Sequence, residues 1–138
     1  MTVDQRIKVA LIISRATLGY KRVEFHHGDC IGADVQAHEL TIGIVDKVVS
    51  HPPANDRFRA FVVADEILGA KGYLVRNKDI VDASDRLIAT PRRFGEEMHS
   101  GTWSTIRYAR KMRTPRLIVW PDGRLKYEDD SVSIEERK

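Results

Sequence analysis

The sequence predicts a small α/β protein, a Rossmann-like three-layer fold in which helices cover both faces of a mainly parallel sheet. A length of 138 residues has room for one domain of ordinary size. Short segments rich in β-branched residues alternate with helical ones, and parallel strands need such crossover connections between them. Internal repeats and low-complexity linkers are absent from the sequence. We therefore expect a single domain at residues 1–125.

The composition is that of a soluble protein, with 42% apolar and 31% charged residues. Cys30 is the only cysteine, which excludes a disulfide framework and a four-cysteine zinc site. No apolar run approaches the roughly 20 residues that cross a bilayer. The N-terminus also lacks the pattern of a signal peptide. We therefore expect a cytoplasmic protein without a membrane partner.

The first predicted element is a helix over Thr2–Leu18. Thr2 and Gln5 have the spacing of a capping box, and Gly19 is a stop signal. Apolar residues recur at helical intervals between them. The apolar run Val9–Ile13 leaves a buried strand as the alternative interpretation of this segment.

The next predicted elements form a strand, a turn, a helix and a second strand. Val23–His27 has the composition of a short strand, and the turn Gly28–Gly32 leads into a helix over Ala33–Ile44. Lys47–His51 is the following strand, which a Pro-Pro pair closes.

Two further helices and two further strands complete the predicted fold. Helices are expected over Tyr73–Ala83 and Thr102–Met112, and strands over Arg86–Thr90 and Leu117–Trp120. The acidic tail, residues 126–138, has little to bury, so we expect it to be disordered.

Ligands of parallel sheets bind outside the carboxyl ends of the strands, where the strand order reverses. This rule selects the loops that follow His27, His51, Thr90 and Trp120 as the candidate site. Two glycine-containing turns that open predicted helices lie in this region.

The first of these turns follows the strand that ends at His27. Gly28 and Gly32 let the backbone approach a ligand closely, and the helix start beyond them offers free N–H groups. Asp34 falls in the first helical turn, where its carboxylate also stabilises the helix. The alternative is an ordinary capped turn between a strand and a helix.

The second turn is Ser100–Thr105. Its hydroxyl groups and backbone amides suit a phosphate, with Arg92, Arg93 or Arg107 as charge partners. Trp103 either stacks on a base or sugar or belongs to the core. Neither turn matches the phosphate loop of ATPases or the glycine fingerprint of NAD-dependent dehydrogenases, so we expect neither class.

The third predicted helix supplies two more candidate ligand contacts, Arg76 and Asn77, which extend toward the end of the sheet. The alternative is a surface ion pair between Arg76 and Asp79, because residues three apart are neighbours on a helix.

The histidines do not indicate a metal site. His26 and His27 are adjacent on a strand, so their side chains face opposite sides of the sheet and cannot hold one ion. For a metal site, the remaining geometric options are His27 with Asp29 and His27 with His51. Cys30, a lone cysteine beside glycines, is typical of a small buried residue. We expect neither a metal nor a cofactor.

Charge is distributed unevenly along the chain, although the net charge is only +3. Eight basic residues lie between Arg86 and Arg116, where Glu96 and Glu97 are the only acids. Such an excess favours an anionic partner, either a phosphate ligand or a nucleic acid. The alternative is a solvated, arginine-rich helix face.

Three motifs, in this order, resemble one superfamily. The segment 26–34, HHGDCIGAD, is similar to a turn of the type HGGxxGAD, and 76–89, RNKDIVDASDRLIA, to a block of the type RNxxIVDxSDxLIA. The segment 100–109, SGTWSTIRYA, resembles a helix start of the type SGTxxTxxYA. Over residues 20–121 the chain thus resembles the SLOG superfamily (SMF/DprA–LOG), Rossmann-like domains that bind nucleotides or nucleotide-derived ligands. The resemblance implies a pocket lined by Gly28, Asp29, Gly32, Asp34, Asn77, Gly101 and Thr102.

One departure from the family pattern concerns catalysis. Phosphoribohydrolases of the lonely-guy type carry PGGxGTxEE, whose acids take part in breaking an N-glycosidic bond. Glu97–His99 stands at the place of PGG here, and Ser104–Thr105 at the place of both acids. The catalytic assignment therefore does not carry over to this chain.

A second departure concerns the first strand, which is central in the sheet of family members and is not visible ahead of Thr2. Either the natural chain starts upstream, or Val9–Ser14 is that strand, or the fold closes without it.

The leading hypothesis is a module that binds a nucleotide or nucleoside derivative at helix N-termini. Hydrolysis of an N-glycosidic or related nucleotide bond and DNA binding of the DprA type are the alternatives. The candidate bases for hydrolysis would be Asp29, Asp34, Glu96 and Glu97. Ligand identity, catalysis and homo-oligomer formation do not follow from the sequence. The expected ligand-binding residues are His27, Gly28, Asp29, Gly32, Asp34, Arg76, Asn77, Thr90, Ser100, Gly101, Thr102 and Trp103.

Overall fold

The computed structural model describes residues 1–130 of the chain. Its helices are α1 (Val3–Gly19), α2 (Ala33–Thr41), α3 (Tyr73–Asp82) and α4 (Gly101–Met112), with the short 3₁₀ helix η1 (Asp56–Phe58). Its strands are β1 (Glu24–His27), β2 (Lys47–Ser50), β3 (Glu66–Ile67), β4 (Leu87–Ala89), β5 (Arg116–Val119) and β6 (Leu125–Glu128).

The strands form two three-stranded sheets. One has the order β1-β2-β3 and is parallel throughout, and the other has the order β4-β5-β6 with β6 antiparallel to β5. Within residues 1–130, no strand pairing joins β1 to β4. The predicted α/β class with mainly parallel strands is therefore confirmed, with the strands divided between two ladders.

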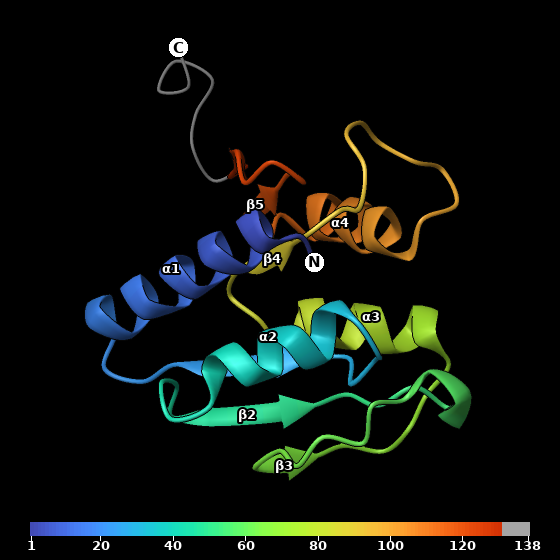
Figure 1. Ribbon diagram of the computed structural model, residues 1–138. Helices are drawn as coiled ribbons and strands as arrows, with labels where there is room; N and C mark the ends of the chain where they lie inside the picture. Colours follow the sequence, from blue (N-terminus) through green and yellow to red (C-terminus); the bar gives the residue numbers. More distant parts are fainter. Residues whose placement is uncertain (131–138) are drawn as a thin grey trace.

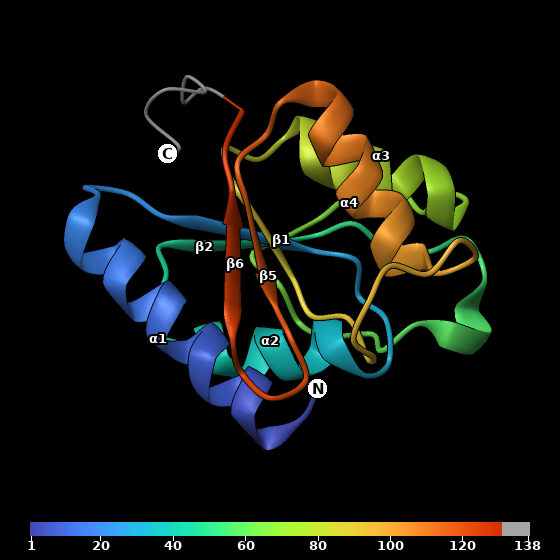
Figure 2. The same cartoon turned by 90° about the horizontal axis from the view of Figure 1, so that it is seen from above.

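The helices lie in two pairs beside these strands. Helix α1 packs against α2, and α3 packs against α4. Figure 1 shows the order of the elements, and Figure 2 shows from above that the strands lie between the two helix pairs. In the second view β5 and β6 run across β1 and β2.

Most of the predicted elements are present with small shifts of their ends, and three points differ. The run Val9–Ile13 lies inside α1, so its interpretation as a strand is wrong. Helix α2 ends at Thr41 rather than Ile44, because Ile42 has a non-helical backbone and Gly43 follows with a φ of +74°. The two-residue strand β3 was not predicted.

The predicted acidic tail also needs correction. Residues 126–128 belong to β6, which pairs along its whole length with β5. Glu128 at the end of β6 accepts hydrogen bonds from Arg110 and Arg116, so its charge holds this strand to the protein. Asp130 of the predicted tail also pairs with Arg116, and residues 131–138 lie outside the described residues.

The start of α1 is fixed by the predicted capping box. The hydroxyl of Thr2 accepts from the Gln5 N–H at 3.0 Å, and Gln5 Oε1 accepts from the Thr2 N–H at 2.9 Å. Gln5 is 1% exposed, and its Nε2 donates to the carbonyls of Pro91 and Val119 at 2.7 and 2.9 Å. One buried amide therefore ties α1 to the chain just after β4 and to the end of β5.

The core consists of two clusters on either side of the second sheet. Val9 and Ile13 of α1 pack with Val119, and the partly buried Phe25 of β1 adds to them. On the other side, Trp103 and Ile106 of α4 pack with Ala89 and Ile118. Among residues 1–130, none of the helices is long and apolar enough to cross a membrane.

Replacing Gln5 by leucine is expected to destabilise the protein by about 2–4 kcal/mol, because two buried carbonyls lose their donor. Urea denaturation measures this difference in the free energy of unfolding. Arg15→Ala, at an exposed position of the same helix, is the control and should change stability by no more than about 0.5 kcal/mol. Equal stability of Gln5→Leu and Arg15→Ala would contradict the role of this amide.

Candidate functional site

The carboxyl end of β2 and the N-terminal ends of α2, α3 and α4 lie on the same side of the molecule, the right-hand side of Figure 1. The first N–H groups of a helix have no partner within it. This side of the protein therefore collects backbone donors and the positive ends of helix dipoles, as the sequence predicted for the ligand edge.

Arg76 of α3 is the central side chain of this edge. It is 5% exposed, and its Nη1 donates to the carbonyls of Gly28 and His51. Its Nε donates to Asn77 Oδ1 at 2.7 Å, and both terminal nitrogens lie 3.5–3.6 Å from Cys30 Sγ. Arg76 thus reaches the sheet end, and the alternative of a surface pair with Asp79 is wrong, because Asp79 pairs with Lys71.

Gly28 makes room for this guanidinium. A Cβ at this position would lie 2.5 Å from Arg76 Nη1 and 2.9 Å from Asp34 Oδ2. Asp34 in turn accepts from the Cys30 N–H at 3.1 Å, which closes the turn onto the start of α2. Gly32 has a φ of +105°, a region that favours glycine, and it precedes α2 without a side-chain cap.

Asp29 is used inside the protein. Its carboxylate is 1% exposed and accepts from Arg59 Nε and from the Val62 N–H, each at 3.0 Å. Its backbone has a φ of +52°, which Asp tolerates better than most residues. Asp29 therefore holds the loop around Arg59 in place, and a ligand hydroxyl would have to compete with both donors. Sequence reasoning missed Arg59, because no local pattern relates it to a residue thirty positions earlier.

The histidines form two separate pairs. His27 Nε2 lies 3.1 Å from His38 Nδ1 of α2, and His27 Nδ1 accepts from the Asp29 N–H at 2.9 Å. His27 is 3% exposed with both ring nitrogens engaged, so the structure assigns it to the interior rather than to a ligand surface. On the opposite face of β1, His26 Nδ1 lies 2.8 Å from His51 Nε2. The predicted option of His27 with His51 is therefore not realised.

One histidine of each pair has a lowered pKa. Burial lowers the pKa of His27. Burial, together with the neighbouring His26 ring, lowers the pKa of His51 to about 4. Within residues 1–130, no group of three or more His, Cys, Asp or Glu side chains is arranged to hold a metal ion.

The second predicted turn opens α4. Ser100 caps the helix by accepting from the Trp103 N–H at 3.3 Å. Trp103 is 2% exposed and packs against Trp120 at a ring distance of 5.9 Å, so its proposed stacking on a base or sugar is corrected to a core role. Gly101 is exposed and Thr102 is half-buried, so both remain accessible, as does the half-buried Thr90 after β4.

Two buried polar atoms of this edge lack a hydrogen-bond partner in the described part of the chain. They are Ser50 Oγ at the end of β2 and Trp103 Nε1 in the first turn of α4. Orphaned buried groups are costly, and a native protein commonly completes them with an ordered water or an ion. Sequence reasoning singled out Trp103 but not Ser50.

The predicted site residues fall into two groups. His27, Gly28, Asp29, Gly32, Asp34, Arg76 and Asn77 surround the ends of β1 and β2, whereas Thr90, Ser100, Gly101, Thr102 and Trp103 lie after β4 and at the start of α4. Over residues 1–130, no hydrogen bond or ion pair joins the two groups directly. A ligand would have to span both.

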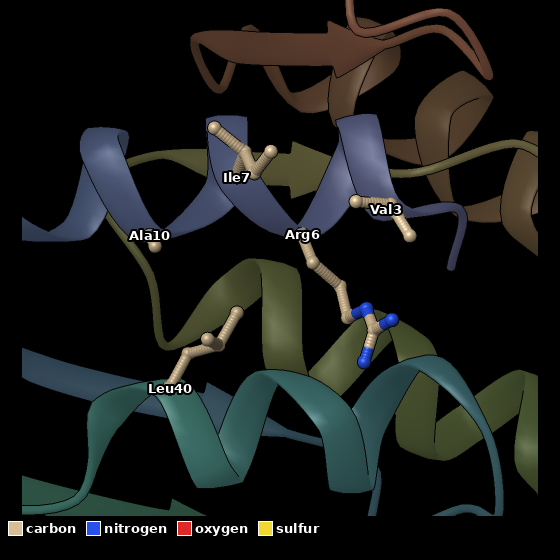
Figure 3. A pocket seen from close by; sticks show the side chains of 5 residues that line it. All are labelled: Val3, Arg6, Ile7, Ala10 and Leu40. Carbon is tan, nitrogen blue, oxygen red and sulfur yellow. The ribbon is translucent and has the colours of Figure 1, made fainter.

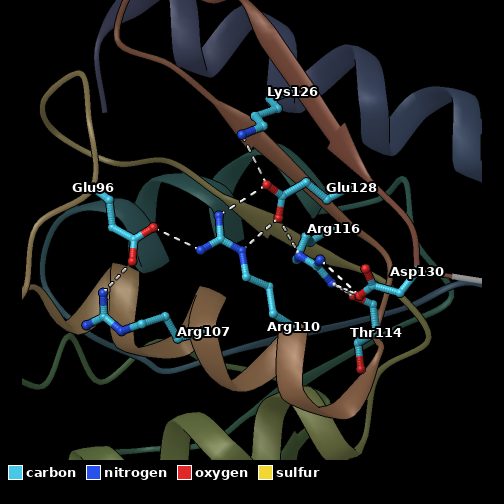
Figure 4. A network of polar contacts seen from close by, with 8 residues as sticks. All are labelled: Glu96, Arg107, Arg110, Thr114, Arg116, Lys126, Glu128 and Asp130. Carbon is cyan, nitrogen blue, oxygen red and sulfur yellow. Dashed lines mark hydrogen bonds and ion pairs between the residues drawn. The ribbon is translucent and has the colours of Figure 1, made fainter. Parts of the chain in front are cut away.

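Within the described residues, four of the eight basic residues between Arg86 and Arg116 pair with acids of the same chain, and Figure 4 shows three of them. Arg107 and Arg110 pair with Glu96, and Arg110 and Arg116 pair with Glu128. The two guanidinium groups on Glu128 outweigh the effect of burial and hold its pKa at about 2. One of the acids that neutralise these arginines is Glu128 of β6, which lies 18 residues after Arg110 and 12 after Arg116.

No family model, no characterised protein and no solved structure matches this chain. The resemblance to the SLOG superfamily therefore stays a prediction from the motifs, and the geometry of the site has to carry the functional argument.

Replacing Gly28 by alanine is expected to lower the free energy of unfolding by about 2–3 kcal/mol. The new Cβ displaces the Arg76 guanidinium from the carbonyls that it bonds. Chemical denaturation gives the value. Gly69→Ala is the matched control, because a Cβ there meets nothing within 4 Å. Equal stability of both variants and the parent protein would contradict the close contact between Gly28 and the Arg76 guanidinium.

Stability is expected to fall as the pH drops from about 6.5 toward 4. An unfolded histidine binds its proton near pH 6.5, whereas folded His51 does so only at about 4. The unfolded state therefore takes up more protons in this window and gains relative stability. Urea midpoints at pH 7, 6 and 5 test this, and His51→Gln should flatten the dependence. A constant midpoint between pH 7 and 5 would refute the expectation.

Proposed function

We propose that the protein binds a nucleotide or a nucleoside derivative at the edge where β1, β2 and β4 end. The observation that carries this proposal is the buried guanidinium of Arg76 beside the start of α2. It is bonded to two carbonyls, one amide oxygen and a thiol. In the described residues it forms no ion pair with a carboxylate. The Asp34 carboxylate lies on the other side of Gly28, but the direct acceptors of this buried cation are neutral, which favours an anionic ligand nearby.

The accessible groups of the edge divide naturally among the parts of a nucleotide. The Thr102 hydroxyl and the first N–H groups of α4 suit a phosphate. Ser100 accepts from the Trp103 N–H, so the N–H groups ahead of Trp103 are the ones left for a ligand. Asp34 suits a ribose hydroxyl. The Cys30 N–H donates to its Oδ2, and Oδ1 is left as the acceptor for a ligand. The amide nitrogen of Asn77 is left to orient the base or ribose, while its oxygen binds Arg76.

The contacts of the carboxylates favour binding over hydrolysis. A general base needs an oxygen that reaches the reacting water or substrate. Asp29 is bonded through both oxygens, and Glu96 is held by two arginines. Glu97 lies 3.7 Å from Arg92. None of these three acids is arranged as a free base, which leaves Asp34 as the one candidate base for the alternative of hydrolysis, and we therefore propose a binding module.

The same distribution of charge bears on DNA binding. Arg107, Arg110 and Arg116 are paired with acids of the same chain, which leaves fewer free cations for phosphates of a nucleic acid. A small anionic ligand requires only one or two such groups.

Membership of the SLOG superfamily, with a Rossmann-like three-layer fold, belongs to the same proposal. Two observations support it: the helices lie in pairs beside mainly parallel strands, and the motif residues Gly28, Asp34 and Arg76 meet at one point. A cytoplasmic location stays a prediction from the sequence.

Thermal-shift measurements with AMP, GMP, CMP and UMP at millimolar concentration test the proposal. We expect at least one of them to raise the melting temperature by about 2–5 °C. Gly101→Val should abolish this shift, because a Cβ at Gly101 points into open space and the larger side chain covers the start of α4.

Two controls make this test specific. Lys78→Ala, at an exposed position next to Asn77, should keep the shift, and Gly101→Val without ligand should melt close to the parent protein. Inorganic phosphate alone should give a smaller shift than the nucleotide. The proposal fails if no nucleotide stabilises the parent protein, or if Gly101→Val and the parent respond equally.

A further inference from the structure

Helix α1 carries apolar residues on two opposite faces, which is unusual for a helix at a protein surface. One face is buried and contributes Val9 and Ile13 to the core. The other carries Val3, Ile7 and Leu11, spaced four residues apart, with exposed fractions of 61%, 52% and 46%. A helix that is apolar on both faces is expected to be covered on both.

The exposed face of α1 borders a groove that it forms with α2 (Figure 3). We call it the α1–α2 groove, and it has a volume of about 310 Å³. In Figure 3 Arg6 extends from α1 toward α2, and Leu40 extends from α2 toward α1. The lining residues are Val3, Arg6, Ile7, Ala10 and Leu40. The groove is a shallow apolar surface with one charged side chain, and it is separate from the nucleotide edge.

The charges beside the groove have opposite signs on its two helices. Arg6 of α1 is exposed, and so is Glu39 of α2, which lies next to Leu40 and on the same helix face as Gln36. Gln36 faces α1, because its Oε1 accepts from the N-terminal ammonium group at 2.6 Å. Within residues 1–130, neither Arg6 nor Glu39 forms an ion pair. One free cation and one free anion therefore flank the same apolar surface.

We propose that the α1–α2 groove is the interface of a homodimer, in which a second copy of this chain covers it with its own α1. In a twofold arrangement the same patch meets itself, so that residue i contacts residue j and j contacts i. Arg6 then faces Glu39 of the second copy, and Glu39 faces Arg6 of that copy. Val3, Ile7 and Leu11 of each chain enter the space between the helices.

Self-association explains these features better than another partner does. A surface with one positive and one negative flank is complementary to itself under a twofold axis, and it needs no second protein with a matching pattern. Exposed apolar residues along one helix face, rimmed by charges, are also the usual composition of an interface centre and rim. The proposal is independent of the nucleotide-binding proposal, because the two surfaces share no residue.

Sedimentation equilibrium from about 1 to 100 µM protein tests the dimer. The parent chain is expected to reach twice its monomer mass within this range. Arg6→Glu and Glu39→Arg should each raise the dissociation constant about tenfold or more, since each places like charges face to face. The double variant Arg6→Glu/Glu39→Arg restores opposite charges and should return to within about threefold of the parent value.

Two further variants separate the interface from effects on folding. Ile7→Ser should weaken the dimer while far-UV circular dichroism stays unchanged, because Ile7 is already exposed in one chain. Lys111→Glu, at an exposed position of α4 in the other helix pair, should leave the dissociation constant as it is. The proposal is overturned if the parent chain is monomeric throughout, or if the dimer survives Ile7→Ser and both charge reversals. Failure of the double variant to recover would overturn the pairing of Arg6 with Glu39.

Discussion

The hydrogen bonds from Arg76 to the carbonyls of Gly28 and His51 join three elements at one edge of the first sheet. These carbonyls follow β1 and β2, and the guanidinium comes from α3, so its position determines where α3 begins relative to both strands. A neutral side chain of similar length could fill the space, but it would leave two carbonyls unpaired in the interior. The absence of a Cβ at Gly28 is the condition for this arrangement. The start of α2 and the thiol of Cys30 pack around the Arg76 guanidinium.

Most side-chain polar groups near this charge are satisfied within the protein, which limits what a ligand can use. Both nitrogens of His27 and both oxygens of Asp29 have partners. What is left at the surface is mainly backbone: the first N–H groups of α2 and α4, together with the amide of Asn77 and the hydroxyl of Thr102. A site built in this way recognises the shape and charge of a phosphate or sugar more than the identity of a base.

Local patterns in the sequence predict the parts of the fold that local interactions stabilise. The capping box of Thr2 and Gln5 sets the start of α1, and it decides between helix and strand for the run that follows. Strand β6 was not predicted, because an acidic segment has no local reason to be ordered. Its stability comes from Arg110 and Arg116, which lie 18 and 12 residues earlier and neutralise Glu128. The site shows the same limit. The motif indicates Arg76 as a ligand contact, but only the fold shows that its side chain is buried against Gly28, which lies 48 residues earlier in the chain.

The ion pair between Asp29 and Arg59 restricts how the sequence can change over evolutionary time. The Asp29 carboxylate is buried, so loss of Arg59 alone leaves an anion without its cation, and loss of Asp29 alone removes the acceptor of the Val62 N–H. Asparagine is the replacement that best tolerates a φ of +52° while keeping an acceptor oxygen. Positions 29 and 59 are therefore expected to be epistatic, so that a substitution accepted at one depends on which residue already occupies the other.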